Sequence, residues 1–307
     1  MQTIFTHLRP DLDAATSVWY FSRFVCPKEE VNLVFVPANW NGADMQEGDV
    51  ALDIEAGGKG EKGTKCPDGR VMSCFAGLVE SHGDDAQYAI LRPVVEFVDA
   101  QDSTGDALYE LFVKCGSACG EMGETVADLV ERKDIPASIR IGGLNSMFRI
   151  MERLAKGNDH ETVRRWSEIL DSIYESGVEL RDAEVEAEKV ERIARPGGIN
   201  ALEPVALVVS SSKNPHLHGR VFDKPGVRVI VRVDGHNLCV LRKDTEKVNL
   251  GTIVRPFIEK VAPADEAKEW FYHSAGFLAA RGTLKAPAKS PSQIDARELA
   301  RHIASSL

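Results

Sequence analysis

The chain has 307 residues, of which 43% are hydrophobic, enough for one large core or, in our interpretation, two ordinary ones. Its net charge of −10 argues against non-specific binding to duplex nucleic acid, which relies on broad basic surfaces, but is compatible with a local basic groove. No apolar run is long enough to cross a bilayer, and the N-terminus lacks the pattern of a signal peptide, so we expect a cytoplasmic protein without a membrane partner.

The first predicted strand and the turn after it hold the densest group of candidate ligands. Residues 2–5 read as a buried strand and residues 14–24 as a helix. His7, Asp11 and Asp13 lie in the turn between them. Strand-to-helix turns are where open α/β sheets bind ligands. An imidazole beside two carboxylates suits a divalent ion such as manganese. The alternative is that Asp11 caps the helix and Asp13 favours its positive end, which leaves His7 unexplained.

Two more predicted strands, residues 31–37 and 50–54, alternate with helical spacing over residues 73–81 and 90–99. Such alternation predicts an α/β domain whose mainly parallel sheet has helices on both faces. Asp53 closes the third strand, so its carboxylate should emerge at the carboxyl edge of the sheet, near the first turn. It is the next candidate metal ligand, with capping of a turn as the alternative.

A glycine-rich basic loop follows Asp53. It contains Lys59, Lys62, Lys65 and Arg70, a composition that suits a phosphate-binding element. A surface loop without such a role is the slightly favoured interpretation. The six cysteines of the chain are expected to be reduced thiols. A zinc site is the disfavoured alternative, because the spacings miss the usual Cys-x2-Cys pattern; its four thiols would be Cys66, Cys74, Cys115 and Cys119.

The segment 98–105, Val-Asp-Ala-Gln-Asp-Ser-Thr-Gly, supplies two further acids. In a helix, Asp99 and Asp102 lie three residues apart and share a face, so both could point at one ion. We favour Asp102 as the ligand and Asp99 as its support. Two solvated acids at a helix end are an equally good interpretation of these residues alone.

The middle of the chain is predicted to be helical. Helices broken by glycine and proline are expected over residues 107–156, followed by one long helix over residues 159–195. The run Arg195-Pro196-Gly197-Gly198 ends that helix, since proline and glycine continue helices poorly. We place the domain boundary there, which gives domains 1–195 and 199–307.

The second domain is predicted to be a smaller α/β unit. Strands are expected over residues 204–209, 227–233 and 237–241, and a last helix over residues 295–305. The turn between the second and third of these strands is expected to be wider than the tightest hairpin.

Four polar residues surround a glycine-containing turn after an aromatic strand near the C-terminus. They are His273, Arg281, Thr283 and Lys285. A guanidinium and an ammonium beside backbone amides suit a phosphate, so we predict substrate binding here. The alternative is that the two basic side chains are merely exposed.

Taken in order, these segments resemble the DHH phosphoesterase superfamily. The first motif, His7-x3-Asp11-x-Asp13, the lone Asp53 and the Val-Asp-Ala-x-Asp segment match its pattern, while residues 74–83 and 270–283 are similar to the melanocyte-proliferating-gene branch. The Asp-His-His triplet that names the superfamily is missing between Asp53 and Cys74. In relatives, the triplet's aspartate bridges two metal ions and its histidines complete their coordination.

The resemblance implies two domains that close over a cleft and a divalent-metal-dependent hydrolysis of a phosphoester in a nucleotide or short RNA. Mn2+ or Mg2+ would be the cofactor, a phosphorylated small molecule or short single-stranded nucleic acid the partner, and a homodimer remains open. Asp13 and Asp53 would be catalytic. The implied metal ligands are His7, Asp11, Asp13, Asp53, Asp102 and Asp99. Because the triplet is missing, the alternative is a degenerate relative that binds a nucleotide or metal without hydrolysis.

Overall fold

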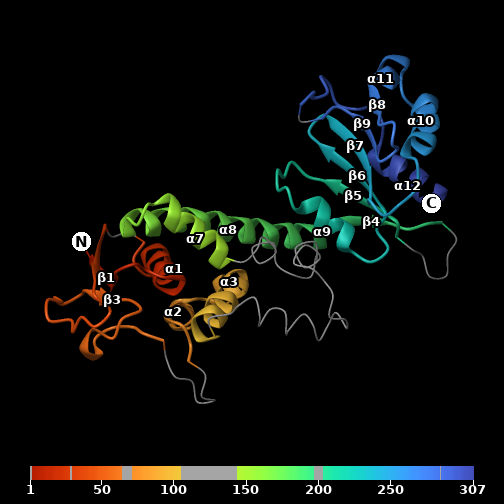
Figure 1. Cartoon of the computed structure of the whole chain (residues 1–307). Helices are drawn as coiled ribbons and strands as arrows, with labels where there is room; N and C mark the ends of the chain where they lie inside the picture. Colours follow the sequence, from red (N-terminus) through yellow and green to blue (C-terminus); the bar gives the residue numbers. More distant parts are fainter. Residues whose placement is uncertain (1, 28–29, 64–70, 105–143, 197–202, 284) are drawn as a thin grey trace, which may run out of the picture. The chain divides into compact units, whose positions relative to one another are not determined.

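The computed structural model describes residues 2–27, 30–63, 71–104, 144–196, 203–283 and 285–307 (Figure 1). The chain divides into two compact units, Met1–Gly177 and Val178–Leu307, with the division inside the long helix α8 (Asp159–Glu188). The boundary at 195–199 stays a prediction. The expected helices over 107–143 lie outside the described residues. So do Lys65, Cys66 and Arg70 of the basic loop.

The first unit is built on a small parallel sheet. Its strands are β1 (Gln2–His7), β2 (Val31–Val36) and β3 (Val50–Ala51), in the order β2-β1-β3. Both pairings are parallel, as the alternation of strands and helices predicts. Strand β3 is shorter than expected because the backbone turns sharply at Asp53, whose φ is 56°.

Helices cover one face of this sheet. They are α1 (Leu12–Tyr20), which continues as the π-helical turn η1 (Phe21–Val25), α2 (Cys74–His82), α3 (Asp85–Thr104), α7 (Leu144–Leu154) and the first part of α8. Ile4 and Leu52 pack with Phe75 and Trp166 in this core. On the opposite face, Phe5 packs in a smaller cluster that includes Ala56 of the short 3-10 helix η2 (Ala56–Gly58).

The second unit contains a six-stranded mixed sheet in the order β4-β5-β6-β7-β9-β8. Its strands are β4 (Glu191–Ile193), β5 (Val205–Val209), β6 (Val229–Asp234), β7 (Asn237–Arg242), β8 (Trp270–Tyr272) and β9 (Leu278–Arg281). The β5–β6 pair is parallel and the others are antiparallel. The helices are α9 (Leu217–Asp223), α10 (Leu250–Val261), α11 (Ala264–Lys268) and α12 (Ala296–Ser306).

Successive side chains of β5 point to opposite faces of this sheet, as the strand period requires. Leu207 packs with α10 and α12, whereas Val208 packs with α9 and the end of α8. The α/β class is thus confirmed, together with a smaller α/β unit at the C-terminal end of the chain. No helix in the described ranges combines the length and apolar character needed to span a bilayer.

Two local expectations are wrong. Helix α8 ends at Glu188 rather than near Arg195, because residues 191–193 form β4 and pair with β5. The β6–β7 hairpin is tight, since Asp234 pairs with Asn237 and leaves a two-residue turn. Gly235 makes this turn with a φ of 58°, which glycine adopts without steric cost.

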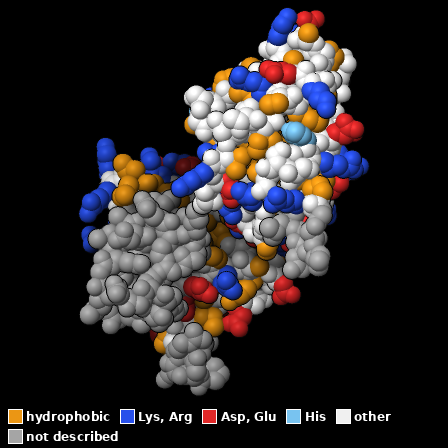
Figure 2. Space-filling view, turned by 90° about the vertical axis from the view of Figure 1, so that its right-hand side faces the viewer, with side chains coloured by type: hydrophobic (Ala, Val, Ile, Leu, Met, Phe, Trp, Pro, Cys, Tyr) orange, Lys and Arg blue, Asp and Glu red, His pale blue; other side chains and the backbone are white. Residues whose placement is uncertain are grey.

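The face of the molecule drawn in Figure 2 carries charges of both signs. On the face shown in Figure 2, Lys and Arg side chains of the described residues are interspersed with Asp and Glu side chains rather than gathered in one broad basic field. A surface of this kind does not favour non-specific binding along a duplex.

Candidate metal centre

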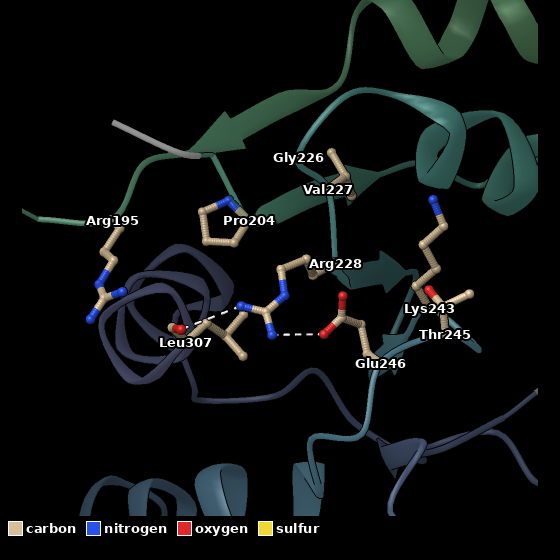
Figure 3. A pocket seen from close by; sticks show the side chains of 9 residues that line it. All are labelled: Arg195, Pro204, Gly226, Val227, Arg228, Lys243, Thr245, Glu246 and Leu307. Atoms are coloured by element: carbon tan, nitrogen blue, oxygen red, sulfur yellow. Dashed lines mark hydrogen bonds and ion pairs between the residues drawn. The ribbon is translucent and has the colours of Figure 1, made fainter. Parts of the chain in front are cut away.

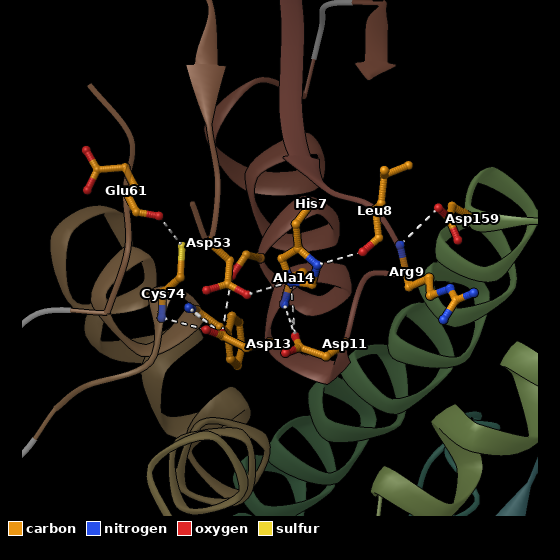
Figure 4. Close-up of polar contacts among 12 residues, drawn as sticks. His7, Leu8, Arg9, Asp11, Asp13, Ala14, Asp53, Glu61, Cys74 and Asp159 are labelled. Atoms are coloured by element: carbon orange, nitrogen blue, oxygen red, sulfur yellow. Dashed lines mark hydrogen bonds and ion pairs between the residues drawn. The ribbon is translucent and has the colours of Figure 1, made fainter. Parts of the chain in front are cut away.

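Three of the predicted ligands meet at the end of β1. His7 Nε2 lies 3.2 Å from Asp53 Oδ2 and 3.8 Å from Asp11 Oδ1 (Figure 4). One potential ligand atom from each residue lies within 4.8 Å of the others. We call these three residues the acidic triad. An imidazole and two carboxylates that converge in this way are ligands suited to a divalent transition-metal ion.

The backbone holds two members of the triad, His7 and Asp11, in place. His7 Nδ1 lies 3.1 Å from the Leu8 carbonyl oxygen, so the neutral ring with its proton on Nδ1 donates there and leaves Nε2 facing the two acids. Asp11 Oδ1 accepts a hydrogen bond from Ala14 N at 3.0 Å and caps α1. The capping interpretation of Asp11 therefore holds together with its place in the triad.

The triad carries more negative than positive charge. The hydrogen bond to Asp53 raises the pKa of His7 to about 9, so in the metal-free protein the imidazole carries a second proton and is positively charged at neutral pH. Burial raises the pKa of Asp53, and the neighbouring charge of Asp11 adds to that effect. A divalent cation would replace the proton on His7 and offset both carboxylates.

Asp13 is buried but lies outside the triad. Its carboxylate accepts hydrogen bonds from Cys74 N at 2.8 Å and Phe75 N at 2.9 Å, the first amides of α2. Asp13 thus lies in the first turn of its own helix, as the sequence predicts, and also accepts the first amides of a second helix, a role that sequence spacing does not reveal. Burial raises the pKa of Asp13, and electrostatic repulsion from the charge of Asp53, a member of the triad, raises it further. Its ligand and catalytic roles stay predictions.

The two acids of α3 differ in their contacts. Asp99 Oδ1 accepts a hydrogen bond from Ser73 N at 2.7 Å, which ties α3 to the residue that caps α2. Asp102 is exposed, and its pKa is raised by desolvation and then by the charges of Asp53 and Asp11. The charges of the triad therefore act on Asp102, although it is not one of the three converging residues.

The predicted phosphate-binding residues of the second unit are engaged in different ways. The Arg281 side chain is 3% exposed, lies 2.8 Å from Glu269 and 3.7 Å from Glu266, and donates to the Ser290 carbonyl oxygen at 2.8 Å. His273 Nδ1 accepts from Ala275 N at 3.1 Å. Thr283 Oγ1 accepts from Ala286 N at 3.1 Å, and Lys285 is exposed. Substrate binding by these four residues stays a prediction.

Two cavities lie outside the sequence prediction. One, of about 280 Å³ in the second unit, contains Arg228, which donates to Glu246 at 2.7 Å and to the Leu307 carbonyl oxygen at 3.3 Å (Figure 3). The other, of about 450 Å³ in the first unit, is lined by Arg9 beside the triad and by the turn between α7 and α8. The run Lys156-Gly157-Asn158-Asp159 signals a turn, but no sequence pattern places it next to Arg9.

Comparison with known proteins yields distant structural likenesses only. No protein-family model and no curated protein matches the sequence. An uncharacterized protein from Helicobacter pylori G27 has 10% identity and a TM-score of 0.23 over 99% of both chains. RecJ from Thermus thermophilus in complex with Mg2+ has 13% identity and a TM-score of 0.30 over 99% of this chain and 50% of its own.

A third likeness is PggH, a pGpG-specific phosphodiesterase from Vibrio cholerae, with 10% identity and a TM-score of 0.31 over 99% of this chain and 97% of its own. Identities and TM-scores this low assign no function to this chain. The superfamily and its branch stay predictions.

Proposed function

We propose that the chain is a divalent-metal-dependent phosphoesterase that acts on a nucleotide or short RNA. The observation that carries the proposal is the convergence of His7, Asp11 and Asp53 within 4.8 Å at the carboxyl edge of the parallel sheet. Ligands bind at this edge in open α/β sheets. The triad's donor set suits Mn2+ or Mg2+, and it leaves the remaining coordination positions to water and to a phosphoryl oxygen.

The three residues of the triad would hold the ion. When bound, a divalent metal supplies a more acidic water and polarises a phosphoryl oxygen. The hydrogen bond between His7 and Asp53 positions the imidazole, and the Leu8 carbonyl fixes which nitrogen faces the acids. The exposed carboxylate of Asp102 can take up a proton near the triad, since its pKa is raised.

The first test is calorimetric titration of Mn2+ into metal-stripped protein, followed by assay of a phosphodiester and a short RNA. We expect saturable binding of Mn2+ and metal-dependent hydrolysis. Asp53→Asn should abolish both, because it removes a charged ligand while asparagine tolerates the left-handed backbone at this position. Asp44→Asn, an exposed aspartate in the preceding loop, is the matched control and should change neither.

The outcomes separate the proposal from its alternative. Absence of Mn2+ binding by the wild-type protein would overturn the proposal. Binding without hydrolysis of any phosphoester would favour the degenerate binding protein instead. The specific observation behind that alternative is the missing Asp-His-His triplet: the described residues converge as a three-residue group, which is sufficient for one ion rather than two.

A further inference from the structure

The cavity of about 450 Å³ in the first unit lies beside the acidic triad. One wall is Arg9 and Pro10, the two residues that precede Asp11 in the loop after β1. The other wall is the turn from α7 into α8, with Arg153, Lys156 and Asp159. Since neighbouring Cα atoms are about 3.8 Å apart, this loop places the cavity's first wall within about 8 Å of a triad residue.

The lining of the cavity carries more positive than negative charge, with Arg9, Arg153 and Lys156 against Glu152 and Asp159. Within the described ranges, the side chains of Arg9, Arg153 and Lys156 form no ion pair. Glu152 pairs with Arg149 at 3.0 Å, whereas Asp159 Oδ2 accepts a hydrogen bond from the Arg9 backbone amide at 3.0 Å and keeps its negative charge, so the three cations remain in excess. Three cations that share one concave surface favour an anion in it.

Backbone strain marks the same place. In the described part of the chain, four non-glycine residues have a left-handed φ, and three of them are Arg9 at 53°, Asp53 at 56° and Lys156 at 55°. Two of these three supply cations to the cavity and the third belongs to the triad. A left-handed conformation is unfavourable for residues with a side chain, and strain of this kind clusters at ligand-binding sites.

We propose that this cavity is an anion subsite in which Arg9, Arg153 and Lys156 bind a phosphate group other than the one that lies at the metal. The inference rests on the proposed function, because that function puts one phosphate group of the substrate at the metal. It narrows the substrate class to phosphoesters that carry a second phosphate. Arg9 links the two sites, because its side chain lines the cavity while its backbone continues into the loop of the triad. Hydrogen bonds from guanidinium groups to a phosphate are charge-assisted and short, and the two arginines add geometric specificity.

The direct test is titration of inorganic phosphate into metal-free protein, followed through the backbone amide NMR signals. We expect signals of residues 9 and 153–162 to shift with saturation. The double variant Arg153→Ala/Lys156→Ala should weaken phosphate binding at least about tenfold. The matched control is Arg164→Ala/Arg181→Ala, which removes the same charge from α8 at positions that do not line the cavity and should bind phosphate as the wild type does. Phosphate binding that is equally strong in both variants, or no shifts in this region, would overturn the subsite.

A kinetic test identifies the group of the substrate that the subsite binds. Thymidylyl-thymidine with and without a 5′-phosphate forms a matched pair that differs by one phosphate group. With Mn2+, the double variant should raise KM for the phosphorylated dinucleotide by about tenfold and leave KM for the other unchanged. An equal rise for both would contradict the subsite. If neither dinucleotide is hydrolysed, the proposed function fails, whereas the phosphate titration still decides the cavity, so the two failures are distinguishable.

Discussion

The two units arrange clustered charges in opposite ways. In the second unit, Arg281 lies against Glu266 and Glu269, so positive and negative groups neutralise one another within the protein. In the first unit, the triad places two carboxylates around a single imidazole, and the buried Asp13 lies in the same field. A neutralised group contributes to the structure of the protein, whereas a group with excess charge can bind a ligand of the opposite charge. A charged residue near a predicted motif is therefore a good candidate for ligand binding only if no neighbouring side chain already neutralises its charge.

The strongest way to break this comparison is to remove one charge from the triad. Asp53→Asn should weaken Mn2+ binding at least about 100-fold, because loss of a charged ligand exceeds the effect of disturbing a ligand's hydrogen-bond partner. Glu269→Gln, which removes one of the two carboxylates beside Arg281, should leave Mn2+ binding unchanged. Calorimetric titration of both variants measures the difference. Equal weakening in the two would contradict the distinction between the units.

The second largest effect is expected at Arg281. Arg281→Met should destabilise the protein by about 3 kcal/mol, because the nearly buried carboxylate of Glu266 loses the cation beside it and keeps only its hydrogen bonds from Ser292 and Gln293. Chemical denaturation gives this free energy of unfolding, with Lys285→Met, an exposed neighbour, as the control that should not change it. The sequence-based role of Arg281 in substrate binding predicts a different result, a raised KM in a protein of normal stability.

The third prediction uses pH. Because the pKa of His7 is raised to about 9 from 6.5, its protonated ring stabilises the metal-free fold fully below pH 6.5. This contribution, at most about 3 kcal/mol, is lost as pH rises from 6.5 to 9. The raised pKa values of Asp13 and Asp53 act in the same direction, since their ionised forms are disfavoured by burial.

Denaturation midpoints measured in EDTA between pH 6.5 and 9 should therefore fall, and His7→Gln should flatten that slope. Stabilisation by Mn2+ should grow over the same range, because a metal binds the neutral imidazole and displaces its proton. A metal-free protein whose stability rises with pH would show that the triad's charges are compensated by other groups.

The sequence predicted local patterns well and spatial neighbours only in part. The alternation of apolar residues is sufficient to find β1, β2 and β5 to β7, and a strand edge predicts that His7, Asp11 and Asp53 meet. The capping of α2 by Asp13 joins residues about sixty positions apart in the sequence, so no local pattern contains it. For the same reason, the cavity between Arg9 and the α7–α8 turn could be found only in the structure.

The smallest expected effect sharpens the comparison at Arg9, where binding and stability should change in opposite directions. Arg9→Gly relieves a left-handed backbone worth about 1 kcal/mol, and the greater freedom of glycine in the unfolded chain offsets about half of that. The variant should therefore be more stable by about 0.5 kcal/mol, while its affinity for inorganic phosphate falls. Arg9→Ala, which keeps the strain and removes the charge, should lose the affinity without the gain in stability. If Arg9→Gly instead bound phosphate normally, the strained backbone would have no role in the anion subsite, and only Arg153 and Lys156 would remain as its cations.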